Sequence, residues 1–288
     1  MYPGKYAEQN PDRSAFVMAA TGERVSYQEF EARSNRVAHY LADKGLGFQD
    51  HYSIFMENNN RYLESCAAGE RSGLYFTCIN SFLTSDELAY IINNSESQIL
   101  ITSMSKLEAA QEALAQCTAI KEVLVVGADD ADLPEGMSDF ASTLSKYPET
   151  PLERELLGAA MLYSSGTTGR PKGIVRPLPE QSPNEPLPVI GFLSGLWRYR
   201  EDMIYLSPAP LYHSAPQAAV GLTLRMGGTV VIMERFDPAD YLRFVEEYQV
   251  SHSQLVPTMF SRMLKMPEED RTKYDLSSLE VAVHAAAP

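Results

Sequence analysis

The sequence predicts an α/β fold with mainly parallel β-sheet flanked by helices. Apolar segments of strand length alternate with segments of helical periodicity along nearly the whole chain. Such alternation is typical of parallel sheets, because each helix carries the chain back to start the next strand in the same direction. The 288 residues, 44% of them hydrophobic, can bury a large core in one large domain or two of average size.

The first half of the chain supplies clear helix starts. Ser26 with Glu29 forms a capping-box pattern before a helix that Gly45 closes, and Thr84 with Glu87 opens another. Further elements are expected as strands at 52–56, 74–79, 98–102 and 122–126 and helices at 61–73 and 106–116.

Residues 127–152 are acidic and loop-like, and Pro148 and Pro151 interrupt them. We expect a boundary there, which divides the chain into a first α/β lobe at 1–150 and a second at 151–288.

The alternation resumes in the second lobe after a segment rich in proline. A strand at 159–163 precedes a run with five prolines between 177 and 188, which excludes a helix or a central strand there. Asp237 is expected to cap a helix with Pro238 in its first turn. Beyond the prolines, helices are expected near 189–199, 217–225, 237–248 and 258–265 and strands at 203–206, 229–233, 253–256 and 279–283.

Composition excludes several function classes. The net charge of −14 repels polyanions, so nucleic acid is not expected as a partner, although a small anion remains possible. Three separated cysteines without CxxC, and histidines without HExxH, predict no disulfide framework and no metal site. No signal peptide and no apolar run of roughly 18 residues is visible, so we expect no integral membrane segment and a cytoplasmic location.

The segment YSSGTTGRPKG at 163–173 combines the residue types that hold phosphate. Its glycines allow close backbone approach, its hydroxyls donate hydrogen bonds, and Lys172 supplies a positive charge. It is no Walker A loop, because that pattern counted from Gly166 requires Gly at position 171, where the chain has Pro171. It also lacks GxGxxG. From residue chemistry alone, a phosphate-binding loop and a flexible surface turn both remain open.

The same segment resembles the signature loop of the AMP-forming adenylating superfamily, and Ser164 to Gly173 meet every position of [ST]SG[ST]TGxPKG. Other similar segments are RVSYQEFEARSNRVAHYL, CAAGERSGLYFTCIN, PLYHSA, QLVPTMFSRMLK and HAAAP, with Thr77 and Ala215 at positions where the family pattern has Pro and Gly. The resemblance covers nearly the whole chain. Within the superfamily it is nearest to acyl-CoA synthetases of fatty, aromatic or steroid-type acids.

The resemblance implies a large N-terminal domain of two stacked lobes and an acid-CoA ligase activity in fatty acid metabolism. A carboxylate attacks the α-phosphate of ATP, pyrophosphate leaves, and the thiol of CoA then attacks the acyl-adenylate. The implied small-molecule partners are therefore a carboxylic acid, ATP with Mg²⁺, and CoA.

The resemblance also implies residue roles. Lys172 would neutralise phosphate charge or tether the loop, and His213 would lie beside the carboxylate and acyl pocket as a positioning or gating residue. The residues implied to wrap the β- and γ-phosphates are Ser164, Ser165, Gly166, Thr167, Thr168 and Gly169. Those implied to pass along the adenine are Ala286, Ala287 and Pro288.

The family's later motifs, with the Mg²⁺-binding Glu, the ribose-binding Asp and the catalytic Lys of a C-terminal domain, are not in these 288 residues. The chain is therefore expected to be a truncated part of a ligase, inactive alone, with the Mg²⁺ and CoA sites largely outside it. Three alternatives stay open. The first is an adenylating enzyme that loads a carrier protein, the second is a non-catalytic nucleotide- or acyl-binding protein, and the third is a folding fragment with no native function at this length.

Overall fold

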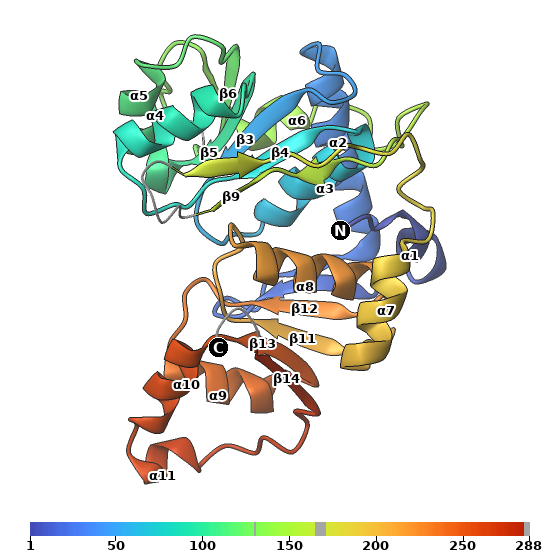
Figure 1. Cartoon of the computed structure of the whole chain (residues 1–288), viewed down its shortest axis with the longest axis vertical. Coiled ribbons are helices and arrows are strands. Elements are labelled where there is room, and N and C mark those ends of the chain that lie inside the picture. The colour runs from blue at the N-terminus through green and yellow to red at the C-terminus, as the bar shows by residue number, and fades with distance from the viewer. Residues whose placement is uncertain (130, 165–170, 285–288) are drawn as a thin grey trace. The chain divides into compact units, whose positions relative to one another are not determined.

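The computed structural model describes residues 1–129, 131–164 and 171–284. Within these ranges the chain forms two compact units, each built on a six-stranded sheet (Figure 1). The predicted α/β fold with mostly parallel sheets between helices is confirmed. The first unit comprises Met1–Phe30, Asn58–Asn60 and Pro186–Pro288, and the second comprises Glu31–Glu57 and Arg61–Glu185.

The sheet of the second unit has the strand order β7-β6-β5-β3-β4-β8, and every neighbouring pair is parallel. Its strands are β3 (His51–Phe55), β4 (Tyr75–Cys78), β5 (Ile99–Ser103), β6 (Glu122–Val126), β7 (Met137–Asp139) and β8 (Ala159–Ala160). After β8, β9 (Leu162–Ser164) and β10 (Lys172–Ile174) form a separate antiparallel pair.

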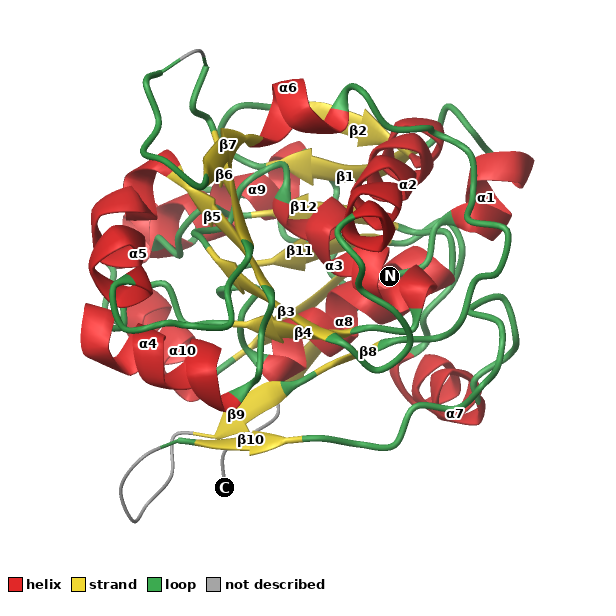
Figure 2. Ribbon diagram, turned by 90° about the horizontal axis from the view of Figure 1, so that it is seen from above, coloured by secondary structure: helices red, strands yellow, loops and turns green. Residues whose placement is uncertain are grey.

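Helices cover both faces of this sheet. α4 and α5 pack on one face, where Ile92 and Ala110 join a buried cluster with Leu100 and Val125 of the strands. Figure 2 shows α2 and α3 on the opposite face. The helices are α2 (Tyr27–Asp43), α3 (Tyr62–Ser72), α4 (Ser85–Asn94), α5 (Leu107–Leu114) and α6 (Phe140–Leu144), with a 3₁₀ turn at Met104–Lys106.

The sheet of the first unit has the order β14-β13-β11-β12-β1-β2, parallel except for the β1–β2 pair. Its strands are β1 (Ser14–Met18), β2 (Arg24–Ser26), β11 (Ile204–Ser207), β12 (Thr229–Ile232), β13 (His252–Leu255) and β14 (Val281–His284). Its helices are α1 (Gly4–Gln9), α7 (Pro188–Trp197), α8 (Ser214–Arg225), α9 (Pro238–Glu247), α10 (Pro257–Leu264) and α11 (Glu268–Arg271). Leu206, Val231 and Leu255 of the sheet share a core cluster with side chains of α9 and α10.

The compact units do not follow a single cut of the chain at residue 150. Phe16 of β1 pairs with Val230 of β12, so the first residues of the chain join the sheet built by its last hundred. Ala159 of β8 pairs with Tyr75 of β4, which adds residues beyond 150 to the second unit. Strand pairing between residues far apart in the sequence therefore decides which residues belong to each compact unit.

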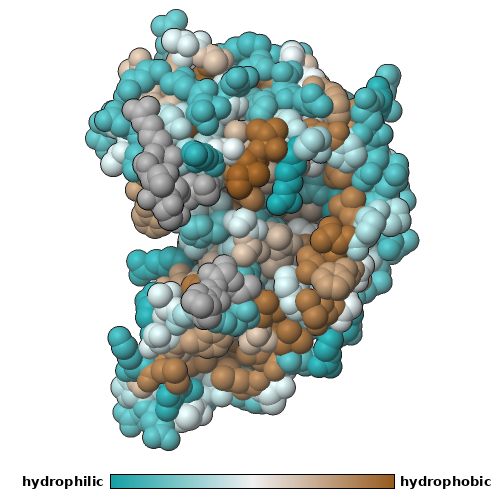
Figure 3. All heavy atoms as spheres, in the orientation of Figure 1, coloured by the Kyte–Doolittle hydropathy of each residue, from teal (hydrophilic) through white to brown (hydrophobic). Residues whose placement is uncertain are grey.

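One segment differs from the sequence expectation, and one expected helix is unusually exposed. Residues 127–152, expected as loop, contain β7 and α6, and Asp139 caps α6 by accepting a hydrogen bond from the Ser142 N–H at 2.7 Å. α7 has no buried residue among the described ones, and Phe192 on it is 69% exposed. Apolar side chains consequently reach the surface of the first unit at α7 (Figure 3). No helix in the described ranges is long and apolar enough to cross a membrane.

Candidate functional site

The predicted phosphate loop connects β9 and β10 in the second unit. The two strands pair antiparallel, and Lys172 at the start of β10 lies opposite Ser164 at the end of β9 (Figure 2). Lys172 is exposed. The described part of the segment is thus a hairpin stem, with the predicted lysine at its open end.

Several predicted site residues lie outside the part of the chain that the structure describes. Those of the loop that lie outside the described residues are Ser165, Gly166, Thr167, Thr168 and Gly169. The predicted adenine-contacting residues outside the described residues are Ala286, Ala287 and Pro288, which follow β14.

Helix α4 holds the hairpin stem on both sides. The Tyr163 hydroxyl of β9 donates to Asn94 Oδ1 at 2.7 Å, and the Tyr90 hydroxyl of α4 donates to the Pro171 carbonyl at 3.0 Å. Partial burial raises the pKa of Tyr163, so its phenol stays protonated and remains a donor at neutral pH. Two hydrogen bonds therefore fix the positions from which the loop leaves and returns.

Gly173 packs closely against two side chains of the stem. A Cβ atom at Gly173 would meet Met161 Cε and would lie 2.9 Å from Tyr163 Cζ. Met161 is buried, so its methyl end would have to shift to admit the extra carbon. The glycine next to Lys172 thus serves the packing of the hairpin.

His213 lies in the first unit, between β11 and α8. It is the N-cap residue of α8 with extended backbone, and its exposed ring lies 4.4 Å from the ring of Tyr212, centroid to centroid. Desolvation by the surrounding protein lowers the pKa of His213 below its ordinary value. The imidazole is therefore neutral at pH 7 and can both donate and accept a hydrogen bond.

Asn58 shapes the turn that leads to His213, and sequence reasoning did not identify it. Its buried side-chain amide donates to the carbonyls of Ala209 at 3.3 Å and Met233 at 2.8 Å, while Oδ1 accepts from the Leu211 N–H at 2.9 Å. These bonds fasten the turn after β11 to the end of β12. The available signal was the polar run of three Asn that follows a predicted strand.

Within each unit, one candidate segment follows the carboxyl end of a parallel strand. His213 comes after β11, and the hairpin that carries Lys172 comes after β8. Ligands in α/β proteins bind at this edge of the sheet. Among the described residues there is no group of three or more His, Cys, Asp or Glu side chains that could hold a metal ion.

The fold is that of an α/β protein whose polar candidate segments follow the carboxyl ends of parallel strands, the edge at which such proteins commonly bind ligands. The chain belongs to the AMP-binding enzyme family, whose model matches residues 5–288. The resemblance to adenylating enzymes stated from the sequence motifs is confirmed by this match.

The curated relatives are acid-CoA ligases of about twice the length. The chain is 29% identical over 282 residues to 4-coumarate--CoA ligase 1 of Petroselinum crispum, which covers 96% of this chain and 50% of that protein. It is 28% identical over 295 residues to the medium/long-chain-fatty-acid--CoA/3-oxocholest-4-en-26-oate--CoA ligase of Mycolicibacterium smegmatis, covering 96% and 53%. The chain thus spans about half the length of the curated relatives it matches.

Solved structures agree with the fold. The N-terminal domain of FACL13 from Mycobacterium tuberculosis superimposes with a TM-score of 0.81 at 21% identity, covering 99% of this chain and 69% of that one. ATP-bound MatB from Rhodopseudomonas palustris gives a TM-score of 0.77 at 26% identity, covering 100% and 56%.

Proposed function

We propose that the protein to which this chain contributes activates a carboxylic acid with ATP and transfers the acyl group to CoA. A carboxylate oxygen bonds to the α-phosphorus while the bond to pyrophosphate breaks. The CoA sulfur then bonds to the acyl carbon, and AMP leaves. The observation that carries this proposal is the SSGTTGRPKG segment on its hairpin stem, in a chain matched by the family model over nearly its whole length.

Within this proposal Lys172 and the loop before it handle the phosphates. The lysine at the open end of the stem neutralises negative charge on ATP, and the backbone and hydroxyl groups of 164–169 donate hydrogen bonds to the β- and γ-phosphates. The strip 286–288 passes along the adenine. This arrangement supplies donors where charge accumulates as pyrophosphate departs.

His213 is proposed as a positioning residue for the carboxylate. Its lowered pKa keeps the ring neutral, so it orients the acid by a hydrogen bond and does not trap it as an ion pair. Asn58 acts through the turn that it holds. The substrate class proposed is a fatty, aromatic or steroid-type acid, a range that the names of the two curated ligases also cover.

The proposal is tested first by ATP binding to the 288-residue chain, since binding does not require turnover. We expect the Lys172→Ala variant to bind ATP about tenfold more weakly, the equivalent of one hydrogen bond to a charged group. Lys121→Ala is the matched control, because Lys121 is an exposed lysine of the same unit bonded to Gln98. Equal affinities of the two variants would contradict the role of Lys172.

Turnover is tested on the protein at its native length, established as the intact mass in the source cells. Pyrophosphate release that depends on a carboxylic acid, followed by acyl-CoA formation, is the expected result. Acyl transfer to a carrier protein but not to CoA would favour the carrier-loading alternative. ATP binding without pyrophosphate release at the native length would favour the non-catalytic binding protein.

A further inference from the structure

Two buried polar atoms of the first unit have no hydrogen-bond partner among the described residues. They are Ser207 Oγ at the end of β11 and Gln254 Oε1 on β13, on residues that are 0% and 7% exposed. A buried polar atom without a partner costs stability, and such atoms are uncommon in folded proteins. Each of the two therefore needs a partner, which is either a ligand or an ordered water.

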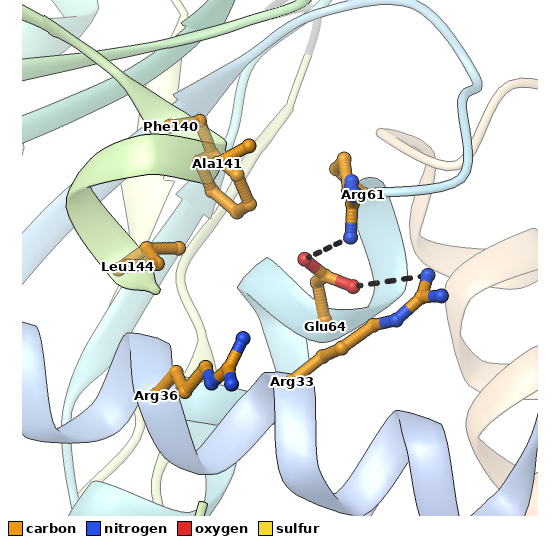
Figure 4. Close-up of a pocket in the computed structure, with 7 residues that line it drawn as sticks. All are labelled: Arg33, Arg36, Arg61, Glu64, Phe140, Ala141 and Leu144. Carbon is orange, nitrogen blue, oxygen red and sulfur yellow. Dashed lines mark hydrogen bonds and ion pairs between the residues drawn. The ribbon is translucent and has the colours of Figure 1, made fainter. Parts of the chain in front are cut away.

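The charged pocket of the second unit differs in this respect. It lies among α2, α3 and α6, and Figure 4 shows Glu64 between Arg61 and Arg33. The carboxylate of Glu64 is 3.4 Å from Arg61 Nη1 and 4.0 Å from Arg33 Nη1, and Arg36 Nη2 is 2.5 Å from Glu149 Oε1. The charged side chains of that pocket are thus paired with one another or with a neighbour, and we assign no ligand to it.

The strand register places Ser207 and Gln254 next to each other. β11 and β13 are parallel neighbours in which Leu206 pairs with Ser253, so Ser207 and Gln254 occupy the next pair of positions. Leu206 belongs to the core cluster that includes side chains of α9 and α10. Because successive side chains of a strand point to opposite faces, Ser207 and Gln254 lie on the other face of the sheet, where Figure 1 shows α8.

The neighbours of this pair on the same face are apolar. Ile232 of β12 lies beside Ser207, and Val283 of β14 lies beside Gln254. Both neighbours are buried. The row across these four strands is therefore polar in its centre and apolar on either side. Such a surface suits an apolar molecule that carries one hydrogen-bonding group.

The pair also lies at the edge of the sheet where the proposed acid site begins. Ser207 is the last residue of β11, and the turn that follows leads to His213 at the N-terminus of α8. No side chain caps α8 there, so the partial positive charge of the helix N-terminus favours a carboxylate beside His213. An acid held in this way would present its body to the same end of the sheet.

A single hydroxyl group satisfies both unpaired atoms. It donates its proton to Gln254 Oε1 and accepts the proton of the Ser207 hydroxyl. A hydrocarbon chain in the same place would leave both atoms unpaired, and sites built to bond a hydroxyl reject analogues that lack it. We propose that Ser207 and Gln254 select an acid that carries a hydroxyl group on an apolar body. The proposal rests on the proposed acid activation and narrows its substrate class.

The test measures acid-dependent pyrophosphate release by the protein at its native length. Two pairs of acids differ by one hydroxyl group: ω-hydroxydodecanoate with dodecanoate, and para-hydroxyphenylpropanoate with phenylpropanoate. We expect kcat/KM to be about tenfold or more higher for the hydroxylated member of at least one pair. Release with these acids but without such a preference would overturn this proposal and leave the proposed function intact. Absence of release with every carboxylic acid would contradict the proposed function itself.

Gln254→Met and Ser207→Ala test the two side chains directly. Each should lower the ratio of kcat/KM between the hydroxylated and the hydrocarbon acid about tenfold, the equivalent of one hydrogen bond. This ratio does not depend on the folded fraction, because both acids are measured on one preparation. Ser253→Ala is the matched control, since Ser253 lies on the opposite face of β13 and its hydroxyl donates to the Leu206 carbonyl at 2.8 Å. It should leave the ratio unchanged.

An ordered water is the competing partner for the two atoms. If it satisfies them permanently, the substrate does not reach them, and Gln254→Met and Ser207→Ala will have the same ratio as the control. That result would overturn the proposal even if the unmodified protein prefers hydroxylated acids.

Discussion

The second unit buries a charged side chain, whereas the buried polar side chains compared with it in the first unit are neutral. In the second unit the side chain of Arg71 is fully buried, with Nη2 bonded to both carboxylate oxygens of Glu31 at 2.6 and 2.7 Å and Nε 2.8 Å from Glu155 Oε1. In the first unit the buried Asn58 and Tyr27 make uncharged hydrogen bonds to backbone groups. Breaking a buried ion pair costs more than losing a neutral hydrogen bond, because a charge is left unpaired in the interior. The second unit should therefore be more sensitive to the loss of one such side chain.

The largest effect is expected for Arg71→Ala. Removing the guanidinium leaves Glu31 and Glu155 without their buried partner, and the free energy of unfolding of the second unit should fall by about 3–5 kcal/mol. Hydrogen exchange of β3 and β5 measured by mass spectrometry reports on this unit alone.

Arg154→Ala provides the control for the charge itself. Arg154 and Glu180 form an ion pair whose side chains are 72% and 69% exposed, and such pairs contribute about 1 kcal/mol or less. If Arg71→Ala and Arg154→Ala lower the free energy of unfolding equally, burial of the charge does not matter and the comparison between the units fails.

A smaller loss is expected for Asn58→Ala in the first unit. The change leaves the Leu211 N–H and the Met233 carbonyl without their partner and should cost about 2 kcal/mol. Fluorescence of Trp197, the single tryptophan of the chain, reports on this unit during urea unfolding. Asn60→Ala is the matched control, since Asn60 makes an exposed hydrogen bond to Glu23, and a loss comparable to that of Asn58→Ala would argue against a special role of Asn58.

Tyr27→Phe measures the contribution of a second neutral buried hydrogen-bonding group in the first unit. The Tyr27 hydroxyl lies 2.7 Å from the Gly228 carbonyl and 3.1 Å from the Leu224 carbonyl, and it is buried. Its loss should lower the free energy of unfolding by about 1 kcal/mol, measured by the same fluorescence. Tyr147→Phe is the control in the second unit, measured by hydrogen exchange of that unit, and it should lose less because its hydrogen bond to Asp43 is exposed.

Local signals in the sequence predicted local structure well. Ser26 and Glu29 form the expected reciprocal hydrogen bonds at the start of α2, and Thr84 and Glu87 form a complete capping box at α4. Both motifs act within four residues, so the pattern alone contains the interaction.

Features that depend on distant partners were not accessible in the same way. β1 belongs to its sheet because Phe16 meets Val230, and Asn58 matters because its partners lie more than 150 residues away. Lys172 was identified by its motif, but its place on a hairpin strand depends on pairing with β9. The buried guanidinium of Arg71 meets carboxylates from two other segments, and no spacing in the sequence brings Glu31 and Glu155 together.

The smallest expected effect is a pH dependence of stability. It tests whether a buried titratable side chain of the first unit is uncharged, like the buried Asn58 and Tyr27. His252 is buried on β13, and desolvation, followed by the charge of Arg200, lowers its pKa below the ordinary value of 6.5. The unfolded chain then binds more protons than the folded one between the two pKa values, so this contribution to stability is present above the ordinary pKa and is lost as the pH falls below it. The urea midpoint by Trp197 fluorescence should therefore decrease from about pH 7 to about pH 5, and less so in His252→Gln. An identical decrease in both proteins would mean that other groups cause the pH dependence. The contrast between charged and neutral buried side chains would then depend on Asn58 and Tyr27 alone.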